Sequence, residues 1–397
     1  MSIYDKATLV QIPSGYKASG AKLYSVLPAN GDGDFTVSAD ADATRIDENG
    51  LIESTVANQA RLSRNFIDGV VQPDPFLLLE PTRTNNASRS ETPQDGSWAD
   101  PLNEWTLLTE TTTSPRGDQT RVFNLEDSTG TLIRCQDFSV AAGTYTISFY
   151  IKDIGGNFTG GVVDLGDVGS GDTTPSLSTV GSEWVRVSRT IAITSTKTFL
   201  DIQLNFTGST NKVGIWGLQL EAGSYATSYI QTTGTAAVTR TADFVSGGGN
   251  SDTFNDSEGT LFIDAAALGN DGTYRVINIS DGTSSNRVLI QLGNNNNQIR
   301  ADLISGGVIQ TSLSTTSYTF TNFNKIAFKY KGDDTALFVN GTQVGATQTG
   351  KTMPTGLDRI DFTNGSLGSV FYFRGKLKQL MYFDTALSNS ELIQLTS

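Results

Sequence analysis

The chain has 397 residues with 28 Lys or Arg against 41 Asp or Glu, and this formal charge of −13 disfavours nucleic acid as a partner. It contains no histidine and a single cysteine, Cys135. These counts exclude Ser-His-Asp triads, His-ligated metal sites, an intrachain disulfide and Cys-rich zinc sites.

The composition favours short strands joined by turns. Glycine accounts for 41 residues and charged residues for only 17%, so we expect an all-β fold, in two or three domains for a chain of this length. No apolar run approaches the ~20 residues of a membrane span, which predicts no membrane insertion. The start, Met1–Lys6, lacks a basic segment followed by an apolar core, which predicts no signal peptide. An all-β, cysteine-poor chain without an export signal suits a protein that is assembled in the cytoplasm and released by lysis.

Residues 1–90 are predicted to form an extended β region. Asp47–Gly50 ends in Asn-Gly, a strong hairpin signal, between short alternating segments. The most apolar stretch is Phe76–Leu79, which prolines flank on both sides. So few core residues cannot support a separate domain. We therefore expect this region to pack on the next domain, on symmetry mates or on a larger assembly.

Residues 91–240 show strands with a period of two, which predicts an antiparallel sandwich or jelly roll. The four clearest strands are Gly143–Lys152, Trp184–Ile193, Phe199–Phe206 and Val213–Leu220. Cys135 lies in an alternating segment, which favours a buried free thiol. Residues 231–258 are rich in Thr, Gly, Ser and Asn and are predicted to be a linker.

A second antiparallel sandwich is predicted over residues 251–397. Its candidate strands are Thr260–Asp264, Tyr274–Ile279, Val288–Leu292, Gln298–Ile304, Lys325–Tyr330, Ala336–Val339 and Phe371–Phe383. The one convincing helix signal is terminal, where Ser388 and Glu391 have capping-box spacing.

Three sets of motifs resemble known families. Gly259–Ile263, Ala336–Gly341 and Gly375–Phe383 followed by Ala386–Leu392 resemble the laminin-G/concanavalin-A-like lectin superfamily. Gly217–Gly223, Ala226–Ile230 and Thr239–Asp243 resemble a carbohydrate-binding-module jelly roll. Ala43–Ile46, Asn49–Glu53 and Leu77–Asn85 resemble bacteriophage tail-fibre and virion proteins. Together the resemblances imply a virion surface protein, on tail or head, that displays lectin-like domains and forms a homotrimer.

Sugar binding usually combines an aromatic platform with amides and carboxylates. The glycan-binding candidates are Trp98, Trp105, Tyr225, Tyr229 and Asn295. Trp184 and Trp216 lie inside alternating strands and are predicted to pack in a core. The Asn294–Asn297 run is a polar loop that could present amides to a glycan.

Calcium is the one metal that the composition allows, because it takes carboxylate and carbonyl oxygens. The candidate ligands are Asp271, Asp281 and Asn286, although turn chemistry explains the same residues without an ion. We otherwise expect no cofactor.

The chain is predicted not to be an enzyme. Glycoside hydrolysis needs two facing carboxylates, whereas Glu126-Asp127 and Asp333-Asp334 are adjacent residues, which point to opposite faces of a strand. The predicted function is adhesion to host-surface or environmental glycans, with residues 1–90 holding other virion proteins. The alternatives are a capsid-decorating or connector protein without glycan affinity and, third, a polysaccharide depolymerase.

Overall fold

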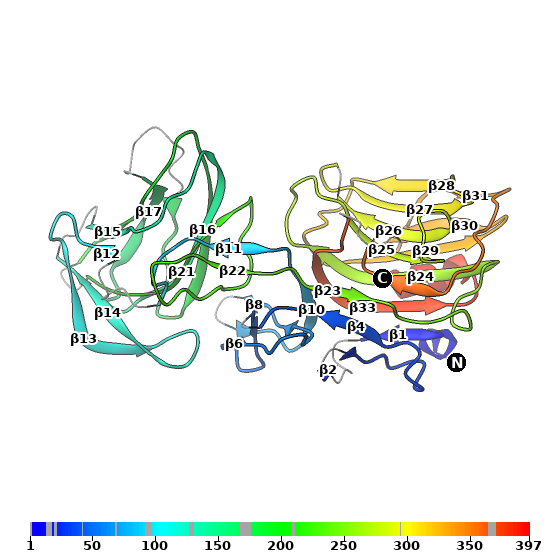
Figure 1. The fold of residues 1–397 in the computed structure, drawn as a ribbon, viewed down its shortest axis with the longest axis horizontal. Helices are drawn as coiled ribbons and strands as arrows, with labels where there is room; N and C mark the ends of the chain where they lie inside the picture. The colour runs from blue at the N-terminus through cyan, green and yellow to red at the C-terminus, as the bar shows by residue number, and fades with distance from the viewer. Residues whose placement is uncertain are drawn as a thin grey trace.

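The structure is a computed structural model that describes residues 2–12, 18–19, 22–41, 43–67, 70–91, 97–126, 131–166, 176–208, 211–293, 295–363 and 371–397. Its regular structure is almost entirely strand, and every strand pair between described residues is antiparallel, which confirms the all-β prediction. Two sandwiches lie along the long axis of the molecule, with short strands of the first 90 residues beneath and between them (Figure 1). In the described part of the chain, no helix is both long enough and apolar enough to cross a membrane.

The middle sandwich packs two five-stranded sheets over one core. One sheet has the order β13 (Trp105–Thr113), β14 (Gln119–Leu125), β21 (Asn211–Ala222), β16 (Gly143–Asp153) and β19 (Val185–Ile193). The other has the order β12 (Trp98–Ala99), β15 (Thr131–Cys135), β20 (Leu200–Phe206), β17 (Phe158–Leu165) and β18 (Ser176–Leu177). Alternate residues such as Ile147, Phe149 and Ile151 fill the core, as the period of two predicts. Cys135 is buried there as a free thiol, as predicted, and burial raises its pKa to about 12.

The C-terminal sandwich has a five-stranded and an eight-stranded sheet. The first has the order β28 (Val308–Thr315), β27 (Ile299–Ser305), β26 (Arg287–Leu292), β25 (Arg275–Ser280) and β32 (Arg359–Asp361). The second begins with β31 (Thr342–Gln348), β30 (Thr335–Val339), β29 (Asn324–Lys331), β24 (Glu258–Ala267) and β33 (Gly375–Phe383).

The N-terminal region completes that second sheet. β10 (Phe76–Leu79) pairs with β33, β7 (Leu62–Ser63) pairs with β10, and β1 (Leu9–Gln11) also pairs with β33. All four side chains of the apolar Phe76–Leu79 run are buried, and Leu77 and Leu79 join the core of the last sandwich of the same chain. The N-terminal region, which was predicted to need a packing partner, therefore packs on strand β33, about 300 residues further along the chain. It does not pack mainly on the domain that follows it in the sequence.

The remaining N-terminal strands are short. β2 (Ala18–Ser19), β3 (Lys22–Leu23) and β4 (Phe35–Ser38) form a small sheet with β23 (Phe244–Ser246). Two hairpins, β5 (Thr44–Ile46) with β6 (Ile52–Ser54) and β8 (Phe66–Ile67) with β9 (Val70–Val71), lie between the sandwiches (Figure 1). The Asp47–Gly50 turn joins β5 to β6, as Asn-Gly predicts.

The predicted linker, residues 231–258, contains two strands instead. β22 (Val238–Arg240) pairs with β11 (Arg83–Asn85), and β23 pairs with β4. The chain therefore enters and leaves the middle sandwich through one two-stranded ribbon. Composition was misleading here because pairing with distant strands satisfies a backbone that the polar side chains alone would leave flexible.

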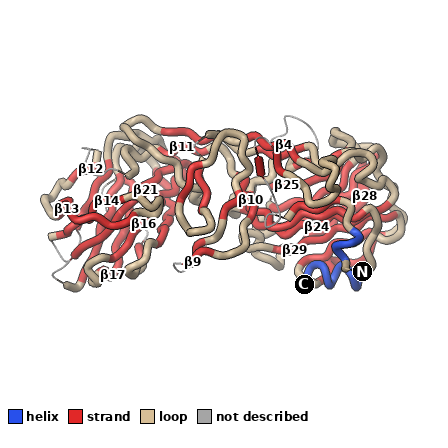
Figure 2. Tube along the Cα trace, turned by 90° about the horizontal axis from the view of Figure 1, so that it is seen from below, coloured by secondary structure: helices blue, strands red, loops and turns tan. Residues whose placement is uncertain are grey.

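The two ends of the chain lie together on the C-terminal sandwich. Helix α1 (Asn389–Thr396) begins after Ser388 with the predicted capping box, and it packs with Ala7 and Val10 on the outer face of the eight-stranded sheet. A short 3-10 helix, η1 (Ile3–Lys6), lies beside it (Figure 2). Lys6 of η1 forms an ion pair with Glu391 of α1.

Candidate functional site

A hollow of about 440 Å³ lies on the outer face of the five-stranded sheet of the C-terminal sandwich. We call it the lectin-face hollow. Side chains alternate along β25, β26 and β27, so one set fills the core and the other set forms the hollow's floor. The floor is built from cross-strand rows: Val276 with Gln291 and Arg300, and Leu289 with Asp302. Loop residues 284–285, 307 and 371 form its walls.

The hollow offers both an aromatic surface and polar groups. Tyr274 and Phe371 meet at its edge with ring centroids 4.8 Å apart and planes tilted by 59°. The Nε of Arg300 donates to an Asp302 oxygen at 2.8 Å, and Asp302 is otherwise buried. Burial lowers the pKa of Arg287, and the negative charge of Asp302 partly opposes this change. The floor thus presents guanidinium, amide and carboxylate groups on rigid strands.

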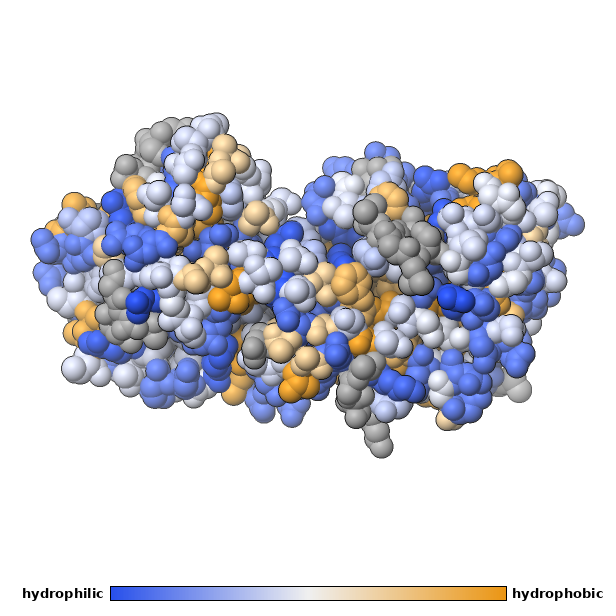
Figure 3. Space-filling view, in the orientation of Figure 1, coloured by the Kyte–Doolittle hydropathy of each residue, from blue (hydrophilic) through white to orange (hydrophobic). Residues whose placement is uncertain are grey.

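Apolar residues continue from the hollow onto the neighbouring strand. Ile309 lines the hollow and is 54% exposed, and Val308 beside it is 60% exposed. An apolar patch is visible at this end of the C-terminal sandwich, at the upper right (Figure 3). An exposed apolar rim beside polar groups is typical of a surface that contacts a ligand.

The predicted glycan contacts lie elsewhere and do not come together. Trp98 is 5% exposed, packs on Phe123 in the middle core and donates from its indole to the Arg89 carbonyl. Tyr229 is 1% exposed beneath Trp216. These two ring faces are therefore not available to a sugar. Trp98, on β12, faces the middle core, and Tyr229, in the loop after β21, packs against Trp216.

The other three candidates are more accessible. Trp105 is partly buried and packs edge-on against Phe123. Tyr225 is half-buried under the Arg83 guanidinium, which lies 5.1 Å from its ring centroid. Asn295 is exposed in a turn of the C-terminal sandwich, outside the lectin-face hollow; Asn294 of the same run lies outside the described residues.

The calcium candidates are separated by a strand. Asp271 precedes β25, where it accepts from the Thr273 amide and pairs with Arg275 at 2.8 Å. Asp281 follows the other end of β25 and accepts from Thr283 and from the Asn286 amide. Turn hydrogen bonds thus occupy these carboxylates. Among the described residues, no three His, Cys, Asp or Glu side chains gather in a way that could hold a metal ion.

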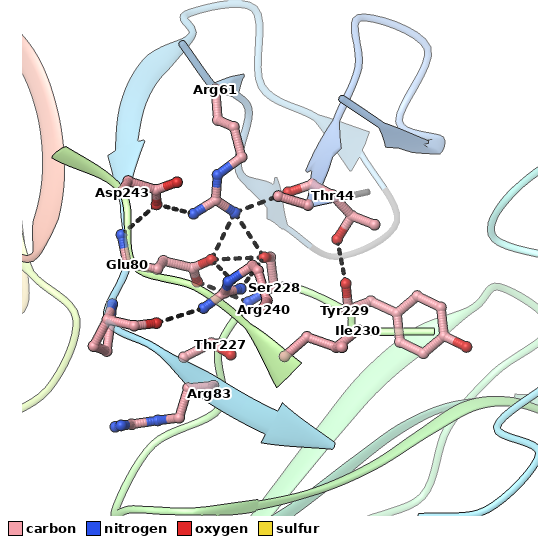
Figure 4. A network of polar contacts seen from close by, with 12 residues as sticks. Thr44, Arg61, Glu80, Arg83, Thr227, Ser228, Tyr229, Ile230, Arg240 and Asp243 are labelled. Carbon is pink, nitrogen blue, oxygen red and sulfur yellow. Dashed lines mark hydrogen bonds and ion pairs between the residues drawn. The ribbon is translucent and has the colours of Figure 1, made fainter. Parts of the chain in front are cut away.

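The sequence motifs meet instead in a buried polar network at the root of the β11–β22 ribbon (Figure 4). We call Arg61, Glu80, Ser228, Arg240 and Asp243 the junction network. Glu80 accepts from Arg61 at 2.7 Å and from Arg240 at 2.6 Å, and Asp243 pairs with the other side of Arg61. Ser228 donates to Glu80 from both its amide and its hydroxyl, at 2.7 and 2.6 Å.

The pKa values in the junction network follow from these contacts. Burial by itself raises the pKa of Glu80, but the charges of Arg240 and Arg61 and the bonds from Ser228 outweigh it and lower the pKa to about 2. Arg61, whose side chain is fully buried, loses solvation, yet Asp243 and Glu80 raise its pKa above the usual value. The charges are therefore paired in the interior, as buried charges must be.

Asn85 extends the connection into the middle sandwich. Its amide nitrogen donates to the carbonyls of Leu218 and Ile230, and its oxygen accepts from the amides of Ala87 and Leu220. The motifs that resemble virion proteins and a carbohydrate-binding module thus build the joint between the sandwiches. This role is not apparent in the sequence, because the partners are about 140 to 180 residues apart.

The C-terminal unit, which carries the lectin-face hollow, is a β-sandwich with a similarity to one known family. Residues 266–393 match the family model described as the Concanavalin A-like lectin/glucanases superfamily, and the described residues that line the lectin-face hollow all fall inside this range. No curated protein matches the chain.

Solved structures offer remote similarities. The CBM40 of the Ruminococcus gnavus IT-sialidase bound to alpha2,3 sialyllactose is 18% identical, with 38% of this chain and 94% of that chain covered and a TM-score of 0.33. Mouse laminin alpha1 domains LG4-5 are 9% identical over 66% and 89% of the two chains, with a TM-score of 0.25. Trypanosoma rangeli sialidase in complex with the inhibitor DANA is 9% identical over 96% and 83%, with a TM-score of 0.31. Similarities of this size carry no argument about ligand or activity.

Proposed function

We propose that the chain is a glycan-binding adhesion protein displayed on a bacteriophage surface, and that its C-terminal sandwich holds the sugar in the lectin-face hollow. The observation that carries this proposal is the Tyr274–Phe371 pair beside Gln291, Arg300 and Asp302 on one rigid sheet face. An aromatic edge can contact the C–H face of a sugar, while amide, guanidinium and carboxylate groups bind its hydroxyls.

We further propose that the protein binds without cleaving. Of the described residues that line the lectin-face hollow, Asp302 is the one carboxylate, and Arg300 holds it at 2.8 Å. The usual hydrolytic arrangement needs a second carboxyl group about 5 to 9.5 Å away. We propose no cofactor, because Asp271, Asp281 and Asn286 are engaged in turns.

Attachment and avidity belong to the same proposal. A shallow sugar site is weak on its own, so several copies in a homotrimer would supply avidity. Residues 1–90 would hold other virion proteins through side chains left exposed after these strands join the C-terminal sandwich, such as Val56 at 66% and Val70 at 61%.

The test is a glycan array probed with the full chain and with two variants of the hollow, Tyr274→Ala and Arg300→Gln. We expect selective binding that both variants weaken at least about tenfold, the loss expected for one contact to a charged or aromatic group. The control is Arg359→Gln, because Arg359 pairs with Asp358 on the same sandwich and lies outside the hollow.

Two results would contradict the proposal. An array without any selective binding, with the protein still present in purified virions, would favour the capsid-decorating or connector function. Release of reducing ends from host polysaccharide would instead favour the depolymerase.

A further inference from the structure

A larger hollow, of about 840 Å³, lies where the middle sandwich meets the N-terminal hairpins. We call it the junction cleft. The outer face of β16 and β19, which we call its floor, the β5–β6 hairpin with Phe66, and Lys376 of the C-terminal sandwich all line it. Because the two sandwiches and the hairpins all contribute residues, the cleft exists only in the intact chain.

The floor is an aromatic platform. Tyr150 and Arg186 are partners across β16 and β19, and the Arg186 guanidinium lies 5.6 Å from the Tyr150 ring centroid. The indole of Trp184 donates to the Thr113 carbonyl at 2.7 Å, which fixes the ring. A Cβ on Gly214 would lie 2.6 Å from that ring, so the indole rests directly on the backbone of β21. Lys152 follows Tyr150 by two residues and shares its face.

The cleft is basic although the chain is acidic. Among the described residues, the lining has five cationic side chains, Arg45, Arg64, Lys152, Arg186 and Lys376, against two carboxylates, Glu80 and Glu183. Glu80 is already neutralised by Arg61 and Arg240 in the junction network. In a chain with a formal charge of −13, this concentration of positive charge calls for an anionic ligand.

Three of these cations, Lys152, Arg186 and Lys376, form no ion pair with a carboxylate of the described residues; the Lys376 ammonium donates to the Asn65 side chain instead. Arg186 donates to the Ser148 hydroxyl at 3.0 Å, and its buried Nε has no hydrogen-bond partner among the residues that the structure describes. Lys152 forms no ion pair with a described carboxylate, whereas Arg45 pairs with Glu53 and Arg64 reaches Glu48. A guanidinium and an ammonium beside a fixed indole match a sugar that carries a carboxylate: its C–H face can stack on Trp184 while its charge binds Arg186 and Lys152.

We propose that the junction cleft binds an acidic oligosaccharide, whose uronate-type carboxylates bind Arg186 and Lys152 and whose ring stacks on Trp184. This site is separate from the lectin-face hollow and takes a different class of ligand. Its volume falls in the range of small-molecule sites and accommodates more than one sugar unit.

The experiment is calorimetric titration of the full chain with hexagalacturonate and with its fully methyl-esterified form, which has the same rings without charge. We expect hexagalacturonate to bind with an affinity that falls as salt rises, and the ester to bind at least about tenfold more weakly. Equal binding of both probes would overturn the role of the cations.

Variants locate the site. Arg186→Gln and Lys152→Met should each weaken hexagalacturonate binding about tenfold, and Trp184→Leu should weaken binding of both probes. The control is Arg189→Gln, because Arg189 lies on the same strand but on the opposite face, donating to the Ser176 carbonyl. Thermal midpoints show that each variant is folded.

The C-terminal variant Arg300→Gln separates this inference from the proposed function. We expect it to leave hexagalacturonate binding unchanged. Loss of binding in Arg300→Gln, together with full binding in Arg186→Gln, would place the acidic sugar in the lectin-face hollow and overturn the junction cleft as a site.

Discussion

Replacing Glu80 with Gln should destabilise the protein more than any single change at its surface. The variant keeps the shape of the side chain but removes the charge that Arg61 and Arg240 share at 2.7 and 2.6 Å. The side chains of all three residues are at most 3% exposed, so water cannot replace the lost interaction. Removing one partner of such a buried network costs about 3 to 5 kcal/mol of the free energy of unfolding.

The pH dependence of stability gives a second value for the free energy that the Glu80 ion pairs contribute to folding. The pKa of Glu80 is lowered from 4.5 to about 2 in the folded protein, and a shift of that size corresponds to about 3 kcal/mol. Because the folded pKa is the lower one, this stabilisation is fully present above pH 4.5 and is lost as the pH falls towards 2.

Urea unfolding of the wild type and of Glu80→Gln, followed by tryptophan fluorescence at several pH values, measures both effects. The free energies of unfolding of the wild type and of Glu80→Gln should differ most near neutral pH and converge at low pH. The control is Glu53→Gln, because Glu53 is 50% exposed and its pair with Arg45 should contribute at most about 1 kcal/mol. A loss below 1 kcal/mol in Glu80→Gln, or a difference that does not shrink in acid, would refute the reasoning.

Three further predictions concern other parts of the molecule. Cys135 should not react with iodoacetamide in the folded protein, because it is buried and its pKa is raised to about 12; rapid labelling without urea would contradict its place in the core. Adding calcium or EDTA should leave the thermal midpoint unchanged, because turn hydrogen bonds engage Asp271 and Asp281; a calcium-dependent rise would show a site that the turns do not explain. Ser388→Ala should lower the free energy of unfolding by about 1 kcal/mol, because α1 loses its N-cap. Chemical unfolding measures this loss. The control is Ser390→Ala, which changes a neighbouring serine that is not the N-cap and should cost less.

Local pattern was enough to predict most strands but few of their partners. The alternation in Gly143–Lys152 and Trp184–Ile193 indicates which face is buried, and the structure has β16 and β19 there. The same pattern does not say that Phe76–Leu79 pairs with β33, because hydrogen bonds between distant backbones leave no local signal. For the same reason, the sequence of residues 231–258 did not indicate that β22 and β23 pair with distant strands.

The aromatic and charged residues show more clearly that the sequence alone does not predict which side chains are buried. Trp98 lies in a loop-rich segment, and only the paired β12 and β15 reveal that its ring faces a core. Arg61 and Asp243 look like ordinary surface charges in the sequence, although both are buried in the structure. Their burial depends on mutual pairing, which requires the fold to exist first. Trp184 was predicted to be a core residue, yet it lines the junction cleft.

The junction network and the junction cleft should be coupled, because the first fixes the walls of the second. Asp243 does not line the cleft, but it pairs with Arg61 and accepts the Glu80 amide at 2.7 Å, so Asp243→Asn acts on the cleft through the joint alone. A looser joint must be ordered again when ligand binds, and this cost weakens affinity. We therefore expect Asp243→Asn to weaken hexagalacturonate binding while glycan binding in the lectin-face hollow stays unchanged. Equal loss at both sites would indicate general unfolding, and full retention at the cleft would show that the hairpins hold its walls without the joint.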